Sequence, residues 1–416
     1  MAKRCPYDPA TYVYEEGRIE MGSKGNAVVG QSGGPTSVIN QSLVGVIEEV
    51  ARIGHVDQLL GAKHGVRGII EEKFVSLNGL GKDFLETLAQ TPSAALASTR
   101  DKPDAAYCRK ILDSFKKHSV QYFFYIGGND SADTARIVHD LAAAEKYPLR
   151  VFHIPKTVDN DLRVHDHCPG FGSAARFVAA GVLGDDLDNA ALPGVKIDVL
   201  MGRNAGFLTA SSVLARRKPG DGPHLIYVPE AALSEDKFLG DVQTVYKKQG
   251  RCLVCVSEGL RDPDGKTWTE RIATGLDVDM HKNVQLSGLG ALGDYLGDLV
   301  KKKLGIKRVR SDTFGYLQRS FPGFTSSVDS AEARLVAREA VKFSAGNKET
   351  QGSVAMRRLS ESPYRIETFL TPLETVAKET KDLDPAYIEG GNDITEAFIR
   401  YCRPLVGELP ATARLD

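Results

Sequence analysis

Short apolar runs, each followed by glycine or polar residues and then by a helical pattern, recur along most of the chain. The runs lie at 26–30, 120–126, 149–154, 195–200, 225–228, 252–256 and 309–316. Continuous apolar runs of this length predict strands that are buried on both faces, and the helical segments between them predict parallel sheets covered by helices. The pattern therefore predicts an α/β protein.

Glycine and polar residues gather where these strands are predicted to end. In parallel sheets, ligands bind beyond the carboxyl ends of the strands. We therefore expect these residues to form one site rather than a set of unrelated turns. The patterns at the two ends of the chain are weaker. Residues 1–25 form an irregular N-terminal extension, and the charged segment 345–416 contains helix candidates at 373–381 and 394–402.

Composition narrows the class of protein. The 416 residues are 42% hydrophobic and 26% charged, which is typical of a globular protein with two or three domains. The formal net charge of −1 gives no overall basic field, so we expect neither nucleic acid nor a membrane as partner. An apolar signal segment and an 18-residue apolar span are both missing, and six cysteines make no disulfide framework; a reducing cytoplasm is expected.

Three motifs that suggest other chemistry are better explained by structure. Cys252 and Cys255 lie in an apolar run, where a spacing of three puts them on opposite faces of a strand, so we interpret them as core residues. The GxGxxG sequence at 288–293 follows no buried strand and is read as a helix start rather than a dinucleotide site. His165 and His167 have no third ligand at a fixed spacing, which favours a polar loop over a metal site.

Two glycine loops, 30–37 and 127–131, each follow a predicted strand and open a helix. Glycine lets the backbone approach a ligand, and a helix N-terminus offers N–H groups to an anion. The second loop adds Asp130, whose carboxylate suits a hard cation bridging phosphates. Taken alone, either loop could equally be an ordinary strand–helix turn with a capping residue.

The segment 155–161 places Asp159 and Asp161 two residues apart, beside Lys156 and Thr157. A carboxylate can act as general base toward a hydroxyl, a second carboxylate can hold metal, and a lysine can neutralise phosphate oxygens. An Asx-turn with a surface lysine is the structural alternative. Arg203, Arg100 and Arg319 are further candidates for phosphate contacts, although each arginine by itself fits a surface position.

In order and spacing, these motifs resemble the phosphofructokinase family over some 300 residues, from about Gly30 to Ser330. The matching elements are Ser32-Gly33-Gly34, Arg100, Gly127–Ser131, Thr157-Val158-Asp159-Asn160-Asp161, Met201-Gly202-Arg203, Glu258-Gly259 and Gln318-Arg319. The resemblance implies two Rossmann-like parallel-sheet domains that face each other across a cleft.

The resemblance also implies an activity. The expected reaction is phosphoryl transfer to C1 of fructose 6-phosphate, a step of glycolysis and gluconeogenesis, with Mg²⁺ as cofactor. Asp159 would be the base, and Arg203 and Lys156 would stabilise the transferring group. The fructose 6-phosphate residues would be Thr157, Val158, Asp159, Met201, Gly202, Arg203, Glu258, Tyr316 and Arg319. The donor would be held by Gly33, Gly34, Arg100, Gly128, Asn129 and Asp130.

Two positions bear on the phosphoryl donor. ATP-using members resemble one another in having glycine where this chain has Asp130 and Lys156. Asp130 adds a side chain and a negative charge where a nucleotide α-phosphate would lie, and Lys156 adds a cation suited to the compact charge of pyrophosphate. Both changes favour pyrophosphate and a reversible reaction. An ATP-dependent enzyme of the same fold is the nearest alternative, and a non-catalytic regulatory subunit or a kinase of the NAD or lipid type is more distant.

Two departures from the family pattern affect the metal and the assembly. Asn129 stands where most members have aspartate, so Mg²⁺ would rely on Asn129, Asp130 and Asp161 together with the donor. Position 194 is glycine where many members place an arginine that reaches a neighbouring subunit, and Lys196 lies close by. By analogy with the family we expect a homodimer or homotetramer.

The predicted domains are discontinuous, because chains of this family cross between domains more than once. Residues 26–170 form the donor-binding domain, rejoined by about 326–375. Residues 171–325 form the fructose 6-phosphate domain, rejoined by about 376–416.

Overall fold

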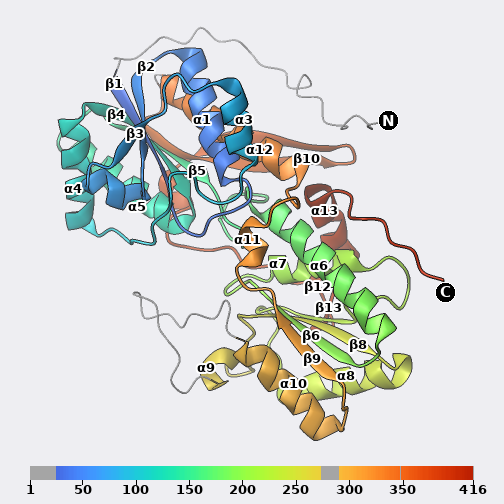
Figure 1. Ribbon diagram of the computed structural model, residues 1–416. Coiled ribbons are helices and arrows are strands. Elements are labelled where there is room, and N and C mark those ends of the chain that lie inside the picture. The colour runs from blue at the N-terminus through green and yellow to red at the C-terminus, as the bar shows by residue number, and fades with distance from the viewer. Residues whose placement is uncertain (1–24, 273–289, 347, 416) are drawn as a thin grey trace.

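The computed structural model describes residues 25–272, 290–346 and 348–415, and these residues build two main sheets stacked one above the other in the view of Figure 1. The upper sheet has seven strands in the order β11-β10-β5-β4-β1-β2-β3, and the lower sheet has four in the order β7-β8-β6-β9. The predicted α/β class is therefore confirmed. Within the described ranges, no helix is long and apolar enough to cross a membrane.

The seven-stranded sheet is parallel except at its edges. Antiparallel pairing is confined to β2 with β3 and β10 with β11. Its strands are β1 Gly25–Gln31, β2 Val56–Ala62, β3 Phe74–Ser76, β4 Val120–Gly127, β5 Arg150–Pro155, β10 Gln351–Glu361 and β11 Tyr364–Thr371.

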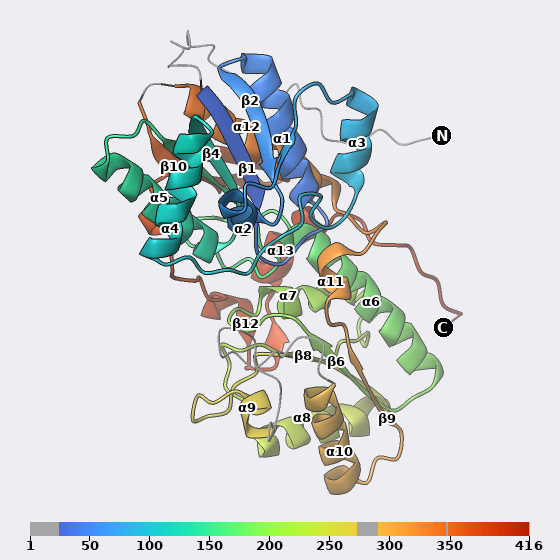
Figure 2. The same ribbon diagram turned by 60° about the vertical axis from the view of Figure 1, so that its left-hand side comes forward.

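Helices cover both faces of this sheet because alternate strand residues point to opposite sides. Ala27 and Val29 of β1 pack in a core with α1 and α12, while Val28 between them packs in a core with α4 and α5. Figure 2 shows α4 and α5 on one side of the strands and α1 and α12 on the other. The helices of this half are α1 Ile39–Ile53, α2 Gly65–Ile70, α3 Lys82–Gln90, α4 Ala105–Lys117, α5 Asn129–Ala144 and α12 Ser327–Ala345.

The four-stranded sheet is parallel throughout and is also covered on both faces. The long helix α6 packs on one face, and α8 and α10 pack on the other. The strands are β6 Val195–Leu200, β7 Leu225–Tyr227, β8 Cys252–Ser257 and β9 Val309–Thr313. The helices are α6 Phe171–Ala191, α7 Phe207–Ala210, α8 Glu235–Gln249, α9 Trp268–Ile272, α10 Ala291–Leu304 and α11 Leu317–Ser320.

The two cysteines of β8 behave as the strand pattern predicts. Cys252 packs in the core beneath α8 and α10, whereas Cys255 packs in the core beneath α6. Burial raises the pKa of the Cys252 thiol to about 12 and also raises that of Cys255. Buried thiols on opposite faces of a sheet cannot form one metal or redox site, so their interpretation as core residues is confirmed.

The C-terminal segment corrects one prediction. Of the helix expected at 373–381, only the short 3₁₀ turn η3 Leu373–Thr375 forms, and Lys378 takes a left-handed φ of 70°. Val376 and Ala377 instead pack with Leu162. The second candidate is present as α13 Glu396–Val406. This helix begins later than predicted, because Asp393–Ile394 pairs as strand β13 with β12, Ile388–Glu389. Short 3₁₀ turns η2 Ser211–Ala215 and η4 Pro385–Tyr387 complete the described elements.

The chain passes between the two halves more than once. Strands β1 to β5 and the hairpin β10–β11 share the large sheet, although α6 to β9 lie between them in sequence. Strands do not fix where a domain ends within a connecting segment, so the boundaries near 170, 325 and 375 stay a prediction. Residues 1–24 and Gly288 of the GxGxxG motif lie outside the described residues, and Gly290 is the N-cap of α10.

Candidate active site

A cavity of about 260 Å³ lies where strands from both sheets end. Its walls come from the segments that follow β1, β4 and β5 of the large sheet and β6, β8 and β9 of the small one, together with residues 99–102 between α3 and α4. The lining residues are Ser32, Gly33, Thr99, Arg100, Asp101, Lys102, Tyr125, Asp130, Ser131, Thr134, Asp159, Met201, Arg203, Asn204, Glu258 and Arg319. Polar segments that are distant in sequence thus meet in one place, as the strand-end pattern predicts.

The first glycine loop carries cationic side chains close to its backbone. Gly33 has a φ of 72°, which favours glycine, and a Cβ there would come within 2.9 Å of the Lys156 Nζ. A Cβ on Gly34 would lie 3.2 Å from the Arg319 Cζ and 3.4 Å from an Arg100 nitrogen. The missing side chains therefore let three cationic groups approach the loop, which suits an anion bound there.

Lys156 is hydrogen-bonded to the backbone of this loop. Its ammonium donates to the Gly34 carbonyl over 2.8 Å, and the residue is only 4% exposed. Burial, followed by the neighbouring charges of Arg100 and Arg319, lowers the pKa of Lys156 to about 7. Because a buried cation near other cations is disfavoured, an anion in the adjoining cavity would stabilise its charged form.

Asp159 presents its carboxylate to the cavity from the loop after β5. Its backbone N–H donates to the Thr157 hydroxyl over 3.1 Å, and its Oδ1 is shielded from solvent without a hydrogen-bond partner among the described residues. Burial raises the pKa of Asp159, against the opposing charges of Arg319, Lys156 and Arg203. A carboxylate oxygen left without a donor can accept a proton from a bound hydroxyl group.

Asp161 points elsewhere. Its Oδ1 accepts from the Thr157 hydroxyl over 3.2 Å, and the residue does not line the cavity. Burial, followed by the charge of Asp159, raises the pKa of Asp161 to about 7. Two carboxylates of one short loop thus have separate surroundings, and Asp159 is the one that faces the cavity.

The small-sheet half contributes β6, β8 and the turn after β9 to the cavity. Gly202 has a φ of 133° and its carbonyl accepts from the Ser257 hydroxyl over 2.6 Å, which fixes the turn that presents Arg203. The Met201 N–H donates to the Gln318 side chain over 3.2 Å. The Arg319 guanidinium lies 4.5 Å from the centre of the Tyr316 ring and lines the cavity together with Glu258. This half therefore offers two arginines and a carboxylate to a polar ligand.

The residues predicted from sequence divide into two groups by position. Those that line the cavity are Gly33, Arg100, Asp130, Asp159, Met201, Arg203, Glu258 and Arg319. Those that are outside the lining are Gly34, Gly128, Asn129, Lys156, Thr157, Val158, Asp161, Gly202 and Tyr316. Lining residues that the motifs missed include Lys102, Thr134 and Asn204. Each is within four residues of a predicted position, so proximity to a motif was the available signal.

The predicted metal ligands are not gathered at one point. The Asn129 amide donates to the Lys378 carbonyl over 3.2 Å, and Asp161 faces Thr157. Asp130 does line the cavity, where its carboxylate lies 3.0 Å from the Lys102 Nζ. Asp130 lines the cavity with a carboxylate, the kind of ligand that Mg²⁺ prefers, whereas Asn129 and Asp161 are turned to other partners.

An acidic group apart from the cavity also has metal-like spacing. Ligand atoms of Asp185, Asp198 and Asp312 lie within 4.8 Å of one another. The Lys196 ammonium already lies 2.8 Å from Asp185 and 3.1 Å from Asp312. Lys196 is thus paired with carboxylates of its own chain. At position 194, where many family members have arginine, a Cβ would lie only 2.6 Å from the Arg308 carbonyl oxygen.

Comparison with known proteins identifies the family of this chain. The sequence profile described as Phosphofructokinase matches residues 26–344. The chain belongs to the phosphofructokinase family. It is 52% identical over 394 residues to a pyrophosphate–fructose 6-phosphate 1-phosphotransferase of Rhodospirillum rubrum, covering 94% of this chain and 97% of that one.

Two further members of the phosphofructokinase family extend the comparison. A protein of the same name from Xanthomonas campestris is 38% identical, with 93% of each chain covered. Among solved structures, a pyrophosphate-dependent phosphofructokinase from Marinobacter aquaeolei superimposes with a TM-score of 0.82 at 31% identity, and 94% of each chain is covered. The fold expected from the sequence resemblance is therefore confirmed.

Proposed function

We propose that this chain transfers a phosphoryl group reversibly from pyrophosphate to C1 of fructose 6-phosphate, giving fructose 1,6-bisphosphate and phosphate. The observation that carries the proposal is the cavity itself, where an Asp159 oxygen without a hydrogen-bond partner shares the lining with Arg203 and Arg319. The name of the 52% identical relative supports the same reaction.

In the forward reaction, Asp159 accepts the proton of the C1 hydroxyl as that oxygen attacks the terminal phosphorus of the donor. Arg203 and Arg319 both line the cavity, where their guanidinium groups stabilise the charge on the transferring phosphoryl oxygens. Phosphate leaves toward the glycine loop, where Lys156 and Arg100 offset its developing charge. The reverse reaction uses the same groups, with Asp159 returning the proton.

Members of this family generally use Mg²⁺. In this chain the ion would be held by the Asp130 carboxylate together with donor oxygens, and it would neutralise part of the donor's charge. We also propose, by analogy with the family, that the enzyme is a homodimer or homotetramer in the cytoplasm.

The identity of the donor is supported by Lys156 and Asp130. Lys156 reaches the backbone of the first glycine loop, so its charge is placed where a compact anion would lie. Asp130 occupies the cavity wall where ATP-using members resemble one another in having glycine. A nucleotide donor would have to accommodate the Asp130 side chain, and its α-phosphate would be repelled by the Asp130 carboxylate.

A donor assay tests this proposal. Purified protein with saturating fructose 6-phosphate and Mg²⁺ should turn over at least about 100-fold faster with pyrophosphate than with ATP, since one lost electrostatic contact typically costs about 10²–10³ in rate. The double variant Lys156→Gly/Asp130→Gly should lose most of this preference. Faster turnover of the native enzyme with ATP would rule out the pyrophosphate donor.

A further inference from the structure

The loop that carries Asp159 continues to Gly170 and closes on itself. The Thr157 N–H donates to the Pro169 carbonyl over 3.1 Å, so the two ends of the loop are joined. Asn160 lies inside the loop, fully buried, with a left-handed φ of 59°. Asparagine tolerates this conformation better than most residues, and its backbone there sets the direction of the neighbouring Asp159.

The Asn160 side chain connects the two ends of the loop to a helix from the C-terminal segment. Its Oδ1 accepts from the Cys168 N–H over 2.9 Å, and its amide donates to the Tyr401 hydroxyl over 2.7 Å. Tyr401, on α13, in turn donates to the Asp166 carbonyl over 2.9 Å. The side-chain amide of Asn160, the neighbour of Asp159, is thus hydrogen-bonded both to the far end of the loop and to α13.

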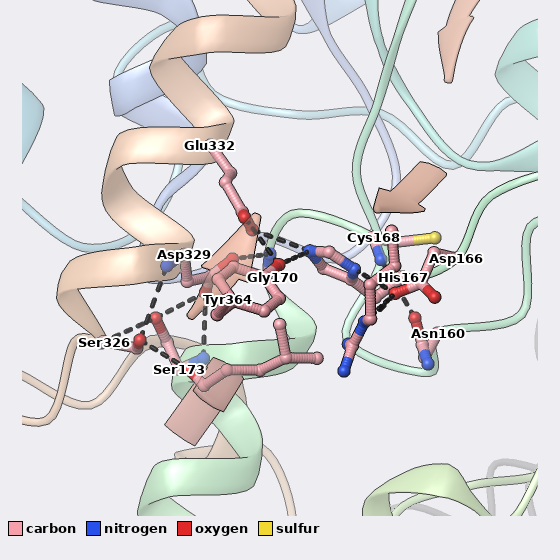
Figure 3. A network of polar contacts seen from close by, with 12 residues as sticks. Asn160, Asp166, His167, Cys168, Gly170, Ser173, Ser326, Asp329, Glu332 and Tyr364 are labelled. Carbon is pink, nitrogen blue, oxygen red and sulfur yellow. Dashed lines mark hydrogen bonds and ion pairs between the residues drawn. The ribbon is translucent and has the colours of Figure 1, made fainter. Parts of the chain in front are cut away.

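The far side of the loop is held by a buried ionic cluster, seen in Figure 3. His167 lies 2.7 Å from the Asp166 carboxylate and 2.6 Å from Glu332 of α12, and Tyr364 of β11 donates to Glu332 over 2.7 Å. Arg358 of β10 also contacts Asp166. Burial by itself lowers the pKa of His167, but the charges of Glu332 and Asp166 outweigh it and raise the value to about 9. A charged His167 therefore locks the segment next to Cys168 onto α12 at neutral pH.

We propose that Asn160 is a positioning residue for Asp159, and that the His167 cluster acts through Asn160 by fixing the Cys168 N–H that it binds. The path runs from α12 through His167, Cys168 and Asn160 to the base. Misplacing a reacting group by about 1 Å can cost about 10²-fold in rate. The inference rests on the proposed role of Asp159 as base, but not on which donor is used.

Two substitutions and their combination test the path. Asn160→Gly removes the amide while keeping a residue suited to a positive φ, and His167→Gln removes the cation. Each should lower kcat by about 10- to 100-fold while KM for fructose 6-phosphate stays within about twofold. The double variant should be within about twofold of the slower single variant, because both changes break one path. Multiplying effects, or an Asn160→Gly enzyme with near-native kcat, would overturn the proposal.

A matched control separates positioning from loss of stability. His55 is also fully buried and also contacts α12, through Ser344 over 3.1 Å, yet it is not in the loop. His55→Gln should lower the melting temperature and leave kcat native. If His167→Gln does not fold, Tyr401→Phe removes the hydroxyl that accepts from the Asn160 amide and should lower kcat in the same manner; native kcat in that variant would overturn the positioning role of Asn160.

The proposed function can fail separately. If the native enzyme uses only ATP, the same series is measured with ATP. If Asp159→Asn keeps native turnover, the base is misassigned whatever the Asn160 variants do.

Discussion

At the scale of single residues, the same buried surroundings shift the pKa values of Lys156 and Asp159 in the directions that favour their neutral forms. Burial lowers the pKa of Lys156 to about 7 and raises that of Asp159. Sequence predicted both residues as catalytic, since two carboxylates and a lysine in seven positions suggest chemistry. It could not predict that Lys156 would lie under the glycine loop, because that contact joins residues 122 positions apart.

The lowered pKa of Lys156 predicts a pH dependence of donor binding. Pyrophosphate favours the ammonium form, so binding takes up a proton once the pH exceeds about 7. KM for pyrophosphate should therefore rise with pH above 7, by up to about tenfold per unit. The methionine of Lys156→Met cannot take up this proton, so its KM should not rise for this reason. The ratio of KM in Lys156→Met to KM in the native enzyme should then shrink from pH 6.5 to 8.5.

Taking that ratio cancels the ionisation of pyrophosphate itself, which both proteins experience equally. Steady-state kinetics at fixed free Mg²⁺ provides the measurement. A ratio that is constant with pH would show that Lys156 keeps its charge throughout this range, or that it does not sense the donor.

At the scale of elements, seven strands were predictable from the runs along the chain, whereas β2, β3, β10 and β11 of the large sheet were not. All seven runs form strands; six of them are buried along most of their length, whereas β9 lies at a sheet edge and is partly exposed. The hairpin β10–β11 was missed because residues such as Arg357, Arg358 and Glu361 interrupt its apolar pattern. The helix expected at 373–381 was wrong because packing of Val376 against Leu162 replaces helical hydrogen bonding there.

Helix packing gives a prediction at this scale. A Cβ on Gly45 of α1 would lie 2.6 Å from the Arg334 carbonyl of α12, so Gly45→Ala must push the two helices apart. We expect a loss of about 1–3 kcal/mol in the free energy of unfolding, measured by urea denaturation. The catalytic rate per folded molecule should be unchanged, because no residue of α1 lines the cavity.

Gly184 of α6 provides the matched control. No atom lies within 4 Å of a Cβ at this exposed helical position, so Gly184→Ala should stabilise the protein by about 0.5–1 kcal/mol. Equal destabilisation by both substitutions would mean that the close approach of α1 and α12 is not what Gly45 serves.

At the scale of the whole molecule, the charge balance hides the character of the site. The chain has a net charge of −1, yet Arg100, Arg203 and Arg319 line one cavity and Lys156 lies beside it. Sequence predicted that these residues would meet, since strand ends of parallel sheets share an edge. It could not predict which of them face inward. The Asn129 amide, for example, donates to the Lys378 carbonyl, 249 positions away. Asn129 is therefore separated from Asp130, although the family resemblance implied that both would bind Mg²⁺.

Because both sheets line the cavity, one ligand should restrain both halves of the molecule. Fructose 1,6-bisphosphate supplied without phosphate cannot react, and in the proposed pose its sugar contacts the Met201–Arg203 turn while its 1-phosphate reaches the glycine loops. Hydrogen exchange should therefore slow in residues 30–37 and 127–134 of the large-sheet half. It should slow equally in residues 201–206 and 315–320 of the small-sheet half.

Helices α4 and α10 serve as internal references, because neither contributes to the lining and their exchange should not change. The size of the effect follows from mass action: ligand at 100 times its Kd stabilises the bound form by about 2.7 kcal/mol, enough to slow any opening that requires release about 100-fold. Protection confined to residues 201–206 and 315–320 would mean that the sugar phosphate binds one half alone. The phosphoryl group would then have to cross a gap that the enzyme closes only when the donor is present.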